Sequence, residues 1–444
     1  MKTTRRTLLS SVLFGAGYLG LRSLATGLPI AVLAKGARRA FADGSATCAN
    51  QSKAKYIILS TSAGGDPINA NVPGMYNDAN IAHSADPRMA ATSLTLNGFA
   101  TKAALPWAST TVGGSMPQWA LDRTTFWHIQ TNTPVHSNER NVLKLMGASS
   151  PSEMLPSILS NALAPCLGTL QPQPITVGAV GPSEGLSYQG QALPILPPVA
   201  VKETLVSPTG PLMSFQKVRD DTLSKIDDIY RNSATPAQSK YLDSLITTRQ
   251  QVRNINTSLL DLLSGIPDNS VKSQIDVAIA LIQMNVSPVI VVHIPFGGDN
   301  HVDAALTRET TEHLTGVASI NYLMTQLQAK NLQDSVLFMS LNVFGRTIGA
   351  NTIGGRNHNE NLQTSITIGN TFKAGMVGAV MPVAGDYGAA PISSSSGAGG
   401  SGGDIAPADT LASFGKTMMA GLGLDTTAIG SLVSSGTVIQ GALA

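Results

Sequence analysis

The 444-residue chain has few charged residues, few aromatic residues and only two cysteines. Charged residues make up 13% of it and aromatic residues 5%, whereas it has 43 glycines and 25 prolines. Two cysteines cannot build a cysteine-rich metal centre, and no Cys-x-x-Cys pair is present. The sequence also has no Gly-x4-Gly-Lys-Ser/Thr segment, which excludes a P-loop. Its 43% apolar content still supports a packed core, so a folded chain with many ordered loops is predicted.

Residues 1–42 have the pattern of an export signal. Arg5 and Arg6 precede a moderately apolar run, and Ala40 and Ala42 fit the small-residue rule of signal peptidase. The paired arginines resemble twin-arginine signals, which export folded proteins from bacteria. A transmembrane anchor is the alternative, but an arginine and several glycines interrupt the run. We predict cleavage at the end of this segment, no stable membrane span afterwards, and a location in the periplasm, at the cell surface or outside the cell.

The positive charge of the whole chain belongs to this segment. The chain has 29 Lys and Arg against 27 Asp and Glu, but residues 43–444 have 22 Lys and Arg against the same 27 acids. Binding to nucleic acid depends on neutralising phosphates with basic side chains. The acidic balance therefore predicts no nucleic-acid partner.

The two cysteines, Cys48 and Cys166, both follow the predicted signal. An exported protein meets an oxidising compartment, in which a disulfide between them could form. Two buried free thiols are the alternative, and the sequence leaves both open.

Continuous apolar segments alternate with segments of helical periodicity. This alternation is typical of a parallel sheet with helices on both faces. We predict an α/β fold with a doubly wound, mostly parallel sheet flanked by helices, in one domain over residues 43–444. The expected strands lie in "KYIILSTS", "TTFWHIQ", "PITVGAV", "SPVIVVHIPF", "DSVLFMSL" and "TSITIGN". Helices are expected over Val271–Gln283, about 306–329 and "ADTLASFGKTMMAGLGL", with a helical hairpin at about 215–263 and a flexible Gly/Ser loop at about 392–404.

Polar loops follow four of these strands. Their sequences are "GGDP", "VHSN", "GGDNH" and "FGRTIGANTIGGRNHNEN". Because the carboxyl ends of parallel strands meet at one edge of a sheet, these loops are expected to line one crevice. Loops rich in glycine, arginine, histidine and amides usually surround a metal ion or an anion.

The segments "GGDP", "GGDNH", "FGRT", "GGRNH" and "ADTLASFGKTMMAGLGL", in this order behind a twin-arginine signal, resemble the bacterial secreted family known as domain of unknown function 1501. The resemblance covers most of the chain after the signal. That family is similar in fold to alkaline phosphatases and sulfatases, and its own substrate is not established. The resemblance therefore implies an alkaline-phosphatase-like fold and one or two divalent metals acting on phosphate or sulfate esters.

The resemblance also implies roles for particular residues. In that family an acid follows the first strand, and this chain has Asp66 there. A carboxylate and an imidazole lie close together at a later family position, and this chain has Asp299 and His301 there. His358 matches the family histidine, and Arg346 matches the arginine after Phe-Gly. These residues are the predicted metal ligands, except Arg346, which could bind an anionic substrate.

Two departures from the family pattern weaken the implied chemistry. Val343 stands where members usually have Glu, and Asn357 where they usually have Asp before the histidine. Two carboxylates and two imidazoles could hold one Zn²⁺ or Mn²⁺, but two ions about 4 Å apart would need more negative charge. Asn357 can add only a neutral oxygen, so it is a weak candidate ligand.

Each candidate also has a structural interpretation. Asp66 precedes Pro67 and could fix a turn. Arg346 could bridge two loops instead of binding an anion. Ser137 follows His136 at a helix start, where it could cap the helix or, less expectedly, act as a nucleophile. His136 and Asp303 are further conceivable ligands.

Two functions remain open from the sequence. One is an exported, non-catalytic binding or assembly protein with a degenerate metal site, which the missing acids favour. The other is a hydrolase of phosphate or sulfate esters that uses a single metal, which the retained acids and histidines favour. One divalent metal or none is expected, and a small anionic ligand fits both functions.

Overall fold

The computed structural model describes residues 51–150, 152–178, 185–206, 225, 262–296, 298, 300–349 and 354–444. The predicted signal, most of the predicted hairpin at 215–263, Cys48 and Asp299 lie outside these residues. Cys166 is disulfide-bonded. In the described part of the chain, no helix combines the length and the hydropathy needed to cross a membrane.

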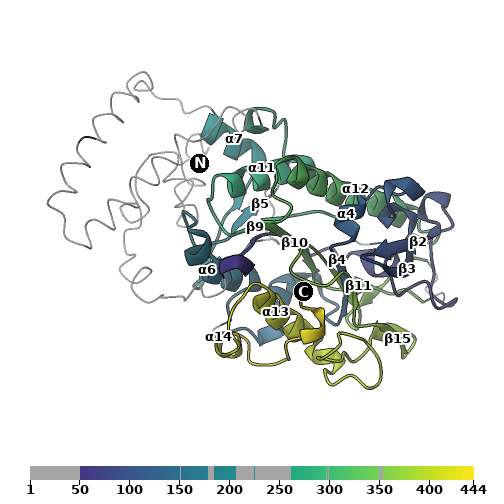
Figure 1. Cartoon of the computed structure of the whole chain (residues 1–444). Helices are drawn as coiled ribbons and strands as arrows, with labels where there is room; N and C mark the ends of the chain where they lie inside the picture. Colours follow the sequence, from purple (N-terminus) through teal and green to yellow (C-terminus); the bar gives the residue numbers. More distant parts are fainter. Residues whose placement is uncertain are drawn as a thin grey trace, which may run out of the picture.

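An eight-stranded sheet forms the centre of the chain (Figure 1). Its strands are β1 (Tyr56–Ser62), β4 (Thr124–Ile129), β5 (Ile175–Val177), β8 (Ile195–Leu196), β9 (Val289–Val292), β10 (Val336–Asn342), β13 (Gln363–Ile368) and β14 (Gly375–Val377). The spatial order is β14-β4-β13-β10-β1-β9-β5-β8. Only β13 runs antiparallel to its neighbours, and all other pairs are parallel. The predicted α/β fold with a mostly parallel sheet is confirmed.

Helices cover both faces of the sheet (Figure 1). On one face, α11 (Val271–Gln283) and α12 (Thr307–Ala329) pack in a core that includes Ile58 and Phe338. On the other, α6 (Leu155–Leu167) and α13 (Thr410–Gly421) pack in a core that includes Ile57 and Leu337. Successive side chains of a strand point to opposite faces of the sheet. Because helices cover both faces here, both sets of side chains are buried, which explains why the strands are apolar throughout. The shorter helices are α4 (Gln118–Leu121), α5 (Glu139–Leu143), α7 (Pro198–Val206) and α14 (Thr426–Leu432).

Outside the central sheet, the described residues form four small two-stranded hairpins. They pair β2 (Ala91–Leu96) with β3 (Phe99–Ala104), β6 (Ser187–Tyr188) with β7 (Gln191–Ala192), β11 (Gly345–Arg346) with β12 (His358–Asn359), and β15 (Val380–Val383) with β16 (Asp386–Ala389). The β11–β12 hairpin lies just after β10 and aligns Arg346 with His358. The Gly/Ser loop is closed by bridges from Ile392 to Gly399 and to Ile405.

The strands β1, β4, β9 and β10 all run in the same direction. The polar loops that follow them therefore leave the sheet at one edge, as the sequence predicts. We call this the carboxyl edge.

Candidate functional site

Three histidines lie together at the carboxyl edge, on loops that follow different strands. His136 begins the 3-10 helix η6 (His136–Asn138) after β4, His301 lies between β9 and α12, and His358 begins β12. The ring centroid of His358 lies 4.6 Å from that of His136 and 4.7 Å from that of His301. The structure thus brings the predicted pair, His301 and His358, into direct contact.

The hydrogen bonds of this pair determine which ring nitrogens carry protons. Nδ1 of His301 lies 2.9 Å from Oδ1 of Asn357, and Nδ1 of His358 lies 2.5 Å from the carbonyl oxygen of Pro134. The Pro134 carbonyl oxygen only accepts, so Nδ1 of His358 is protonated. With its amide oxygen facing His301, Asn357 accepts from a protonated Nδ1 of His301 as well. In neutral rings, both Nε2 atoms then carry lone pairs. These two atoms face each other at 3.0 Å.

In these tautomers, two lone pairs at this distance repel each other unless a proton or a metal ion lies between them. An extra proton would convert one ring to imidazolium, and a metal ion would bind both rings. The proton is disfavoured because burial, followed by the charges of Arg346, His136 and His301, lowers the pKa of His358, although its Pro134 hydrogen bond acts against this. The pair therefore presents two ring nitrogens that a metal ion could bind if the rings moved apart by a few tenths of an ångström.

Phe344 forms a buried wall beside the histidines. Its ring stacks on His358 at a centroid distance of 4.4 Å and meets His136 edge-on at 4.9 Å. Gly65 has a φ of +68°, and a Cβ at this position would lie 1.9 Å from the Phe344 ring. Glycine at position 65 is thus required for the loop after β1 to pack against this wall.

Arg346 is fully buried and joins two of the loops. Its Nε donates to the carbonyl oxygen of Gly65, and its Nη2 donates to the carbonyl oxygens of Gly64 and, at 3.0 Å, of Gly298. Its backbone N–H and C=O pair with the side chain of Asn69 at 3.2 and 2.7 Å. These contacts agree with the interpretation that Arg346 bridges two loops. Anion binding by Arg346 stays a prediction.

Asp66 is buried in the loop that follows β1. It is 2% exposed, and it precedes the 3-10 helix η2 (Pro67–Ala70) without a capping hydrogen bond from its side chain. The Ser62 hydroxyl donates to Oδ1 at 3.2 Å, whereas Oδ2 is buried without a hydrogen-bond partner among the described residues. Burial raises the pKa of Asp66 to about 7, although His293 and Ser62 act against this shift. This carboxyl group can therefore hold a proton near neutral pH.

Two other acids and a serine have these positions in the structure. The carboxylate of Asp303 accepts from the backbone N–H groups of Arg308 (3.1 Å) and Glu309 (2.8 Å), so it caps α12. Ser137 is exposed in η6, and Asn138, not Ser137, is the N-cap residue of α5. Asp299, a predicted ligand, lies outside the described residues.

The two departures from the family pattern have different surroundings. Val343 is fully buried in the apolar core that contains Leu341 and Phe344. Asn357 lies in the site, where its side chain accepts from His301 and its backbone N–H donates to Oγ1 of Thr347 at 2.9 Å. An acid at position 357 could therefore act on the metal through His301, while an acid at position 343 would be placed in the core.

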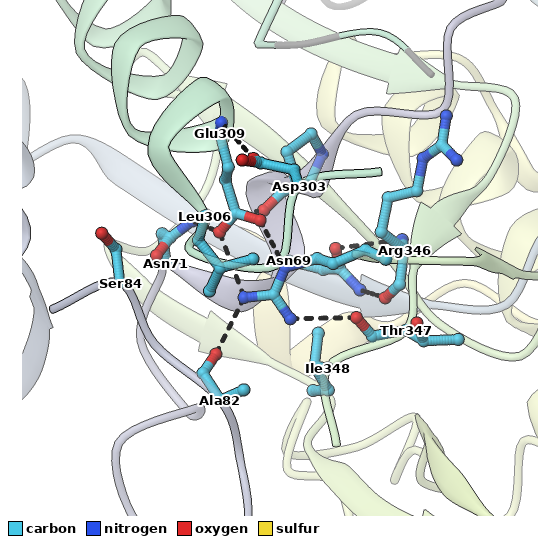
Figure 2. Close-up of polar contacts among 12 residues, drawn as sticks. Asn69, Asn71, Ala82, Ser84, Asp303, Leu306, Glu309, Arg346, Thr347 and Ile348 are labelled. Atoms are coloured by element: carbon cyan, nitrogen blue, oxygen red, sulfur yellow. Dashed lines mark hydrogen bonds and ion pairs between the residues drawn. The ribbon is translucent and has the colours of Figure 1, made fainter. Parts of the chain in front are cut away.

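A buried ion pair that the sequence analysis missed supports the His358 loop. Arg356 and Glu309 are both fully buried, and Nε and Nη2 of Arg356 donate to the two carboxylate oxygens. Arg356 also donates to the carbonyl oxygens of Thr347 (3.0 Å) and Ala82 (2.8 Å). Figure 2 shows Glu309 at the start of α12 and the nearby Asn71, together with Ala82 and Thr347, whose carbonyl oxygens accept from Arg356.

The same ion pair fixes the position of the loop that contains His301. The backbone N–H of Arg356 donates to the carbonyl oxygen of Asn300 at 3.1 Å, and the Asn71 side chain donates to Glu309 at 2.9 Å. One buried cluster thereby ties together the loops on which His301 and His358 lie. No local sequence signal marks it, because Glu309 and Arg356 belong to different elements.

Within the described ranges, no group of three or more His, Cys, Asp or Glu side chains is arranged to hold a metal ion. His301 and His358 could supply two ligands to a metal ion, and a third would have to come from outside those ranges, where Asp299 lies, or from a molecule that binds with the metal. No protein-family model matches the chain, and no curated protein matches it.

Proposed function

We propose that this protein binds one late transition-metal ion, of the class of Zn²⁺, between His301 and His358, and that it works as a binding protein after export. The facing Nε2 atoms carry this proposal. Two nitrogens that bind one tetrahedral Zn²⁺ at about 2.1 Å each lie about 3.4 Å apart, and these are 3.0 Å apart, so the rings would separate by about 0.4 Å on binding. Imidazole nitrogens favour Zn²⁺, Cu²⁺ or Ni²⁺ over Mg²⁺ or Ca²⁺, which take oxygen ligands.

The chain's own residues would orient the ligands, although His301 and Asn357 are exposed to solvent. Asn357 and Pro134 fix the Nδ1 protons, so each ring presents Nε2. Phe344 covers one face of His358. When bound, the metal would act as a Lewis acid with an open coordination position, which an anionic or neutral donor group of a bound molecule could occupy. Asp66 and Asp299 are the other ligands that the sequence proposes, with Asn357 as a weaker candidate.

Two features near His301 and His358 favour a binding function over ester hydrolysis. The Arg346 guanidinium already donates to three backbone carbonyls. A second metal would need further acids, and Val343 and Asn357 occupy the positions where the family has them.

One observation favours hydrolysis as a second candidate. Asp66 is a buried acid whose pKa is raised to about 7, which suits a general acid or base. Hydrolysis of nitrophenyl phosphate or nitrophenyl sulfate by the zinc-loaded protein, lost in Asp66→Asn, would replace the binding proposal with this one.

The proposal predicts a specific result for metal titration. The purified protein, stripped with chelator, should bind one equivalent of Co²⁺, with visible absorption bands typical of nitrogen ligands, and Zn²⁺ should displace it. His301→Gln and His358→Gln should each weaken binding at least tenfold, because each removes one of two imidazoles. His293→Gln, which alters a histidine beside Asp66, is the matched control and should bind normally. Equal binding by all four proteins would sink the proposal.

A second prediction concerns Asn357→Asp. A carboxylate that accepts from Nδ1 makes the imidazole a stronger ligand, and changes of this kind alter metal affinity by about 10- to 100-fold. We expect tighter Co²⁺ binding by about tenfold in competition with a chelator of known affinity. Asn361→Asp, which adds the same charge nearby, should have a much smaller effect. If the two variants tighten binding equally, the effect comes from net charge and not from His301.

A further inference from the structure

A small cavity lies at the edge of the sheet opposite the histidines. It has a volume of about 150 Å³, and its lining includes Lys53, Lys55, Asn370, Thr371, Gly421 and Ala444. Lys55 precedes β1, and Thr371 follows β13, the antiparallel strand. Both positions lie at the amino ends of the parallel strands, so this cavity is separate from the candidate metal site.

The cavity lining is basic, although the chain after residue 42 is acidic. Lys53 is exposed, and Lys55 is half-buried with its Nζ donating to the carbonyl oxygen of Asp334 at 2.6 Å. An ammonium group has three donors, so that contact leaves two for a ligand. None of the lining residues has an acidic side chain. A carboxylate on Ala444 would offset one of the two positive charges and leave the other.

A helix end also meets the cavity, and its charge has to be weighed. Gly421 is the last residue of α13, and the carbonyl end of a helix carries about half a negative charge. Together with a carboxylate on Ala444, it would leave only a small net positive charge from the two lysines. A Cβ at Gly421 would lie 2.7 Å from Cγ2 of Thr371, so the helix end packs directly on that residue.

Thr371 and Asn370 add neutral donors. Thr371 is 9% exposed, and its Oγ1 is buried without a hydrogen-bond partner among the described residues. A buried hydroxyl without a hydrogen-bond partner is unfavourable, and Thr371 is one of the residues that line the cavity. The Asn370 amide lies at the exposed side.

We propose that this cavity binds a small oxyanion through Lys53, Lys55 and the Thr371 hydroxyl. The chemistry is that of a phosphate or carboxylate group, either free or as part of a larger molecule. Inorganic phosphate is the simplest probe, and glycerol phosphate distinguishes an attached phosphate from the free ion.

The test is calorimetric titration of the chelator-stripped protein with inorganic phosphate and with glycerol phosphate, at constant ionic strength. We expect saturable binding of one equivalent, weakened at least tenfold in Lys53→Gln/Lys55→Gln. Thr371→Val should weaken phosphate binding several-fold while leaving the phosphate-free protein as stable as the unmodified one or more so. Lys102→Gln/Lys144→Gln removes the same charge elsewhere and should bind normally.

Each other result overturns the proposal. No saturable binding, or binding that both lysine pairs weaken equally, would show an adventitious ion only. A Thr371→Val variant that loses stability but binds phosphate normally would give the hydroxyl a purely structural role. Because the metal is stripped and His301→Gln should bind phosphate normally, failure here leaves the metal proposal unaffected.

Discussion

Replacing Arg356 by methionine should destabilise the protein by about 3–5 kcal/mol, the range found when one partner of a buried ion pair is removed. The remaining Glu309 carboxylate would be fully buried, with the Asn71 side-chain amide as a neutral partner. Two backbone carbonyls, of Thr347 and Ala82, would also lose their donors. The free energy of unfolding from urea titration, followed by fluorescence, measures this loss.

The controls for Arg356→Met separate the buried charge from the lost volume. Glu309→Gln should be destabilising as well, and the double variant Arg356→Met/Glu309→Leu should recover part of the loss, since no charge stays buried. Arg88→Met removes a partner from the exposed pair with Asp86 and should have little effect. If Arg356→Met is as mild as Arg88→Met, the ion pair does not support the site loops as described.

The second large effect concerns Asp66 and pH. Its pKa is about 7 in the folded protein against an ordinary value of 3.8, so between these values the folded state holds a proton that the unfolded state has released. Stability should therefore fall as pH rises from about 4 to about 7. Each pKa unit corresponds to about 1.4 kcal/mol, so the total is on the order of 4 kcal/mol.

Asp66→Asn should remove this pH dependence, because the amide is neutral at every pH. With metal removed, the variant should match the unmodified protein near pH 4 and exceed it in unfolding free energy near pH 8. Urea titrations across this range provide the comparison. Parallel curves for the two proteins would mean that Asp66 titrates normally and is not the buried proton carrier inferred here.

The helices and the central strands could be predicted from the sequence because burial on both faces leaves a strong pattern. The helix expected over Val271–Gln283 has those bounds, β9 lies within its expected apolar segment, and β10 extends one residue beyond its segment. The reversed direction of β13 was not predicted. An apolar segment such as "TSITIGN" indicates a strand but not its direction, which depends on the chain connections.

The site could be predicted in part. The order of the loops placed His301 and His358 in one crevice, and the parallel strands explain why they meet. The sequence could not decide between the two interpretations of Arg346, because the carbonyls of Gly64 and Gly298 become its neighbours only in the fold. The Arg356–Glu309 pair was missed for the same reason.

The resemblance to the domain of unknown function 1501 family, the alkaline-phosphatase-like fold, the export signal and the implied activity remain predictions. The α/β frame and the contact between the two histidines are what the structure adds. The first question to test is therefore whether the protein binds a metal ion, before any question of which ester it hydrolyses.

Anomalous X-ray diffraction from zinc-soaked crystals, recorded on both sides of the zinc edge, tests the central claim most directly. The account predicts one strong anomalous peak within bonding distance of Nε2 of both His301 and His358. It also predicts that the peak is absent from crystals of His358→Gln. A peak beside Asp66 without contact to these histidines, or no peak at full zinc loading, would contradict the account.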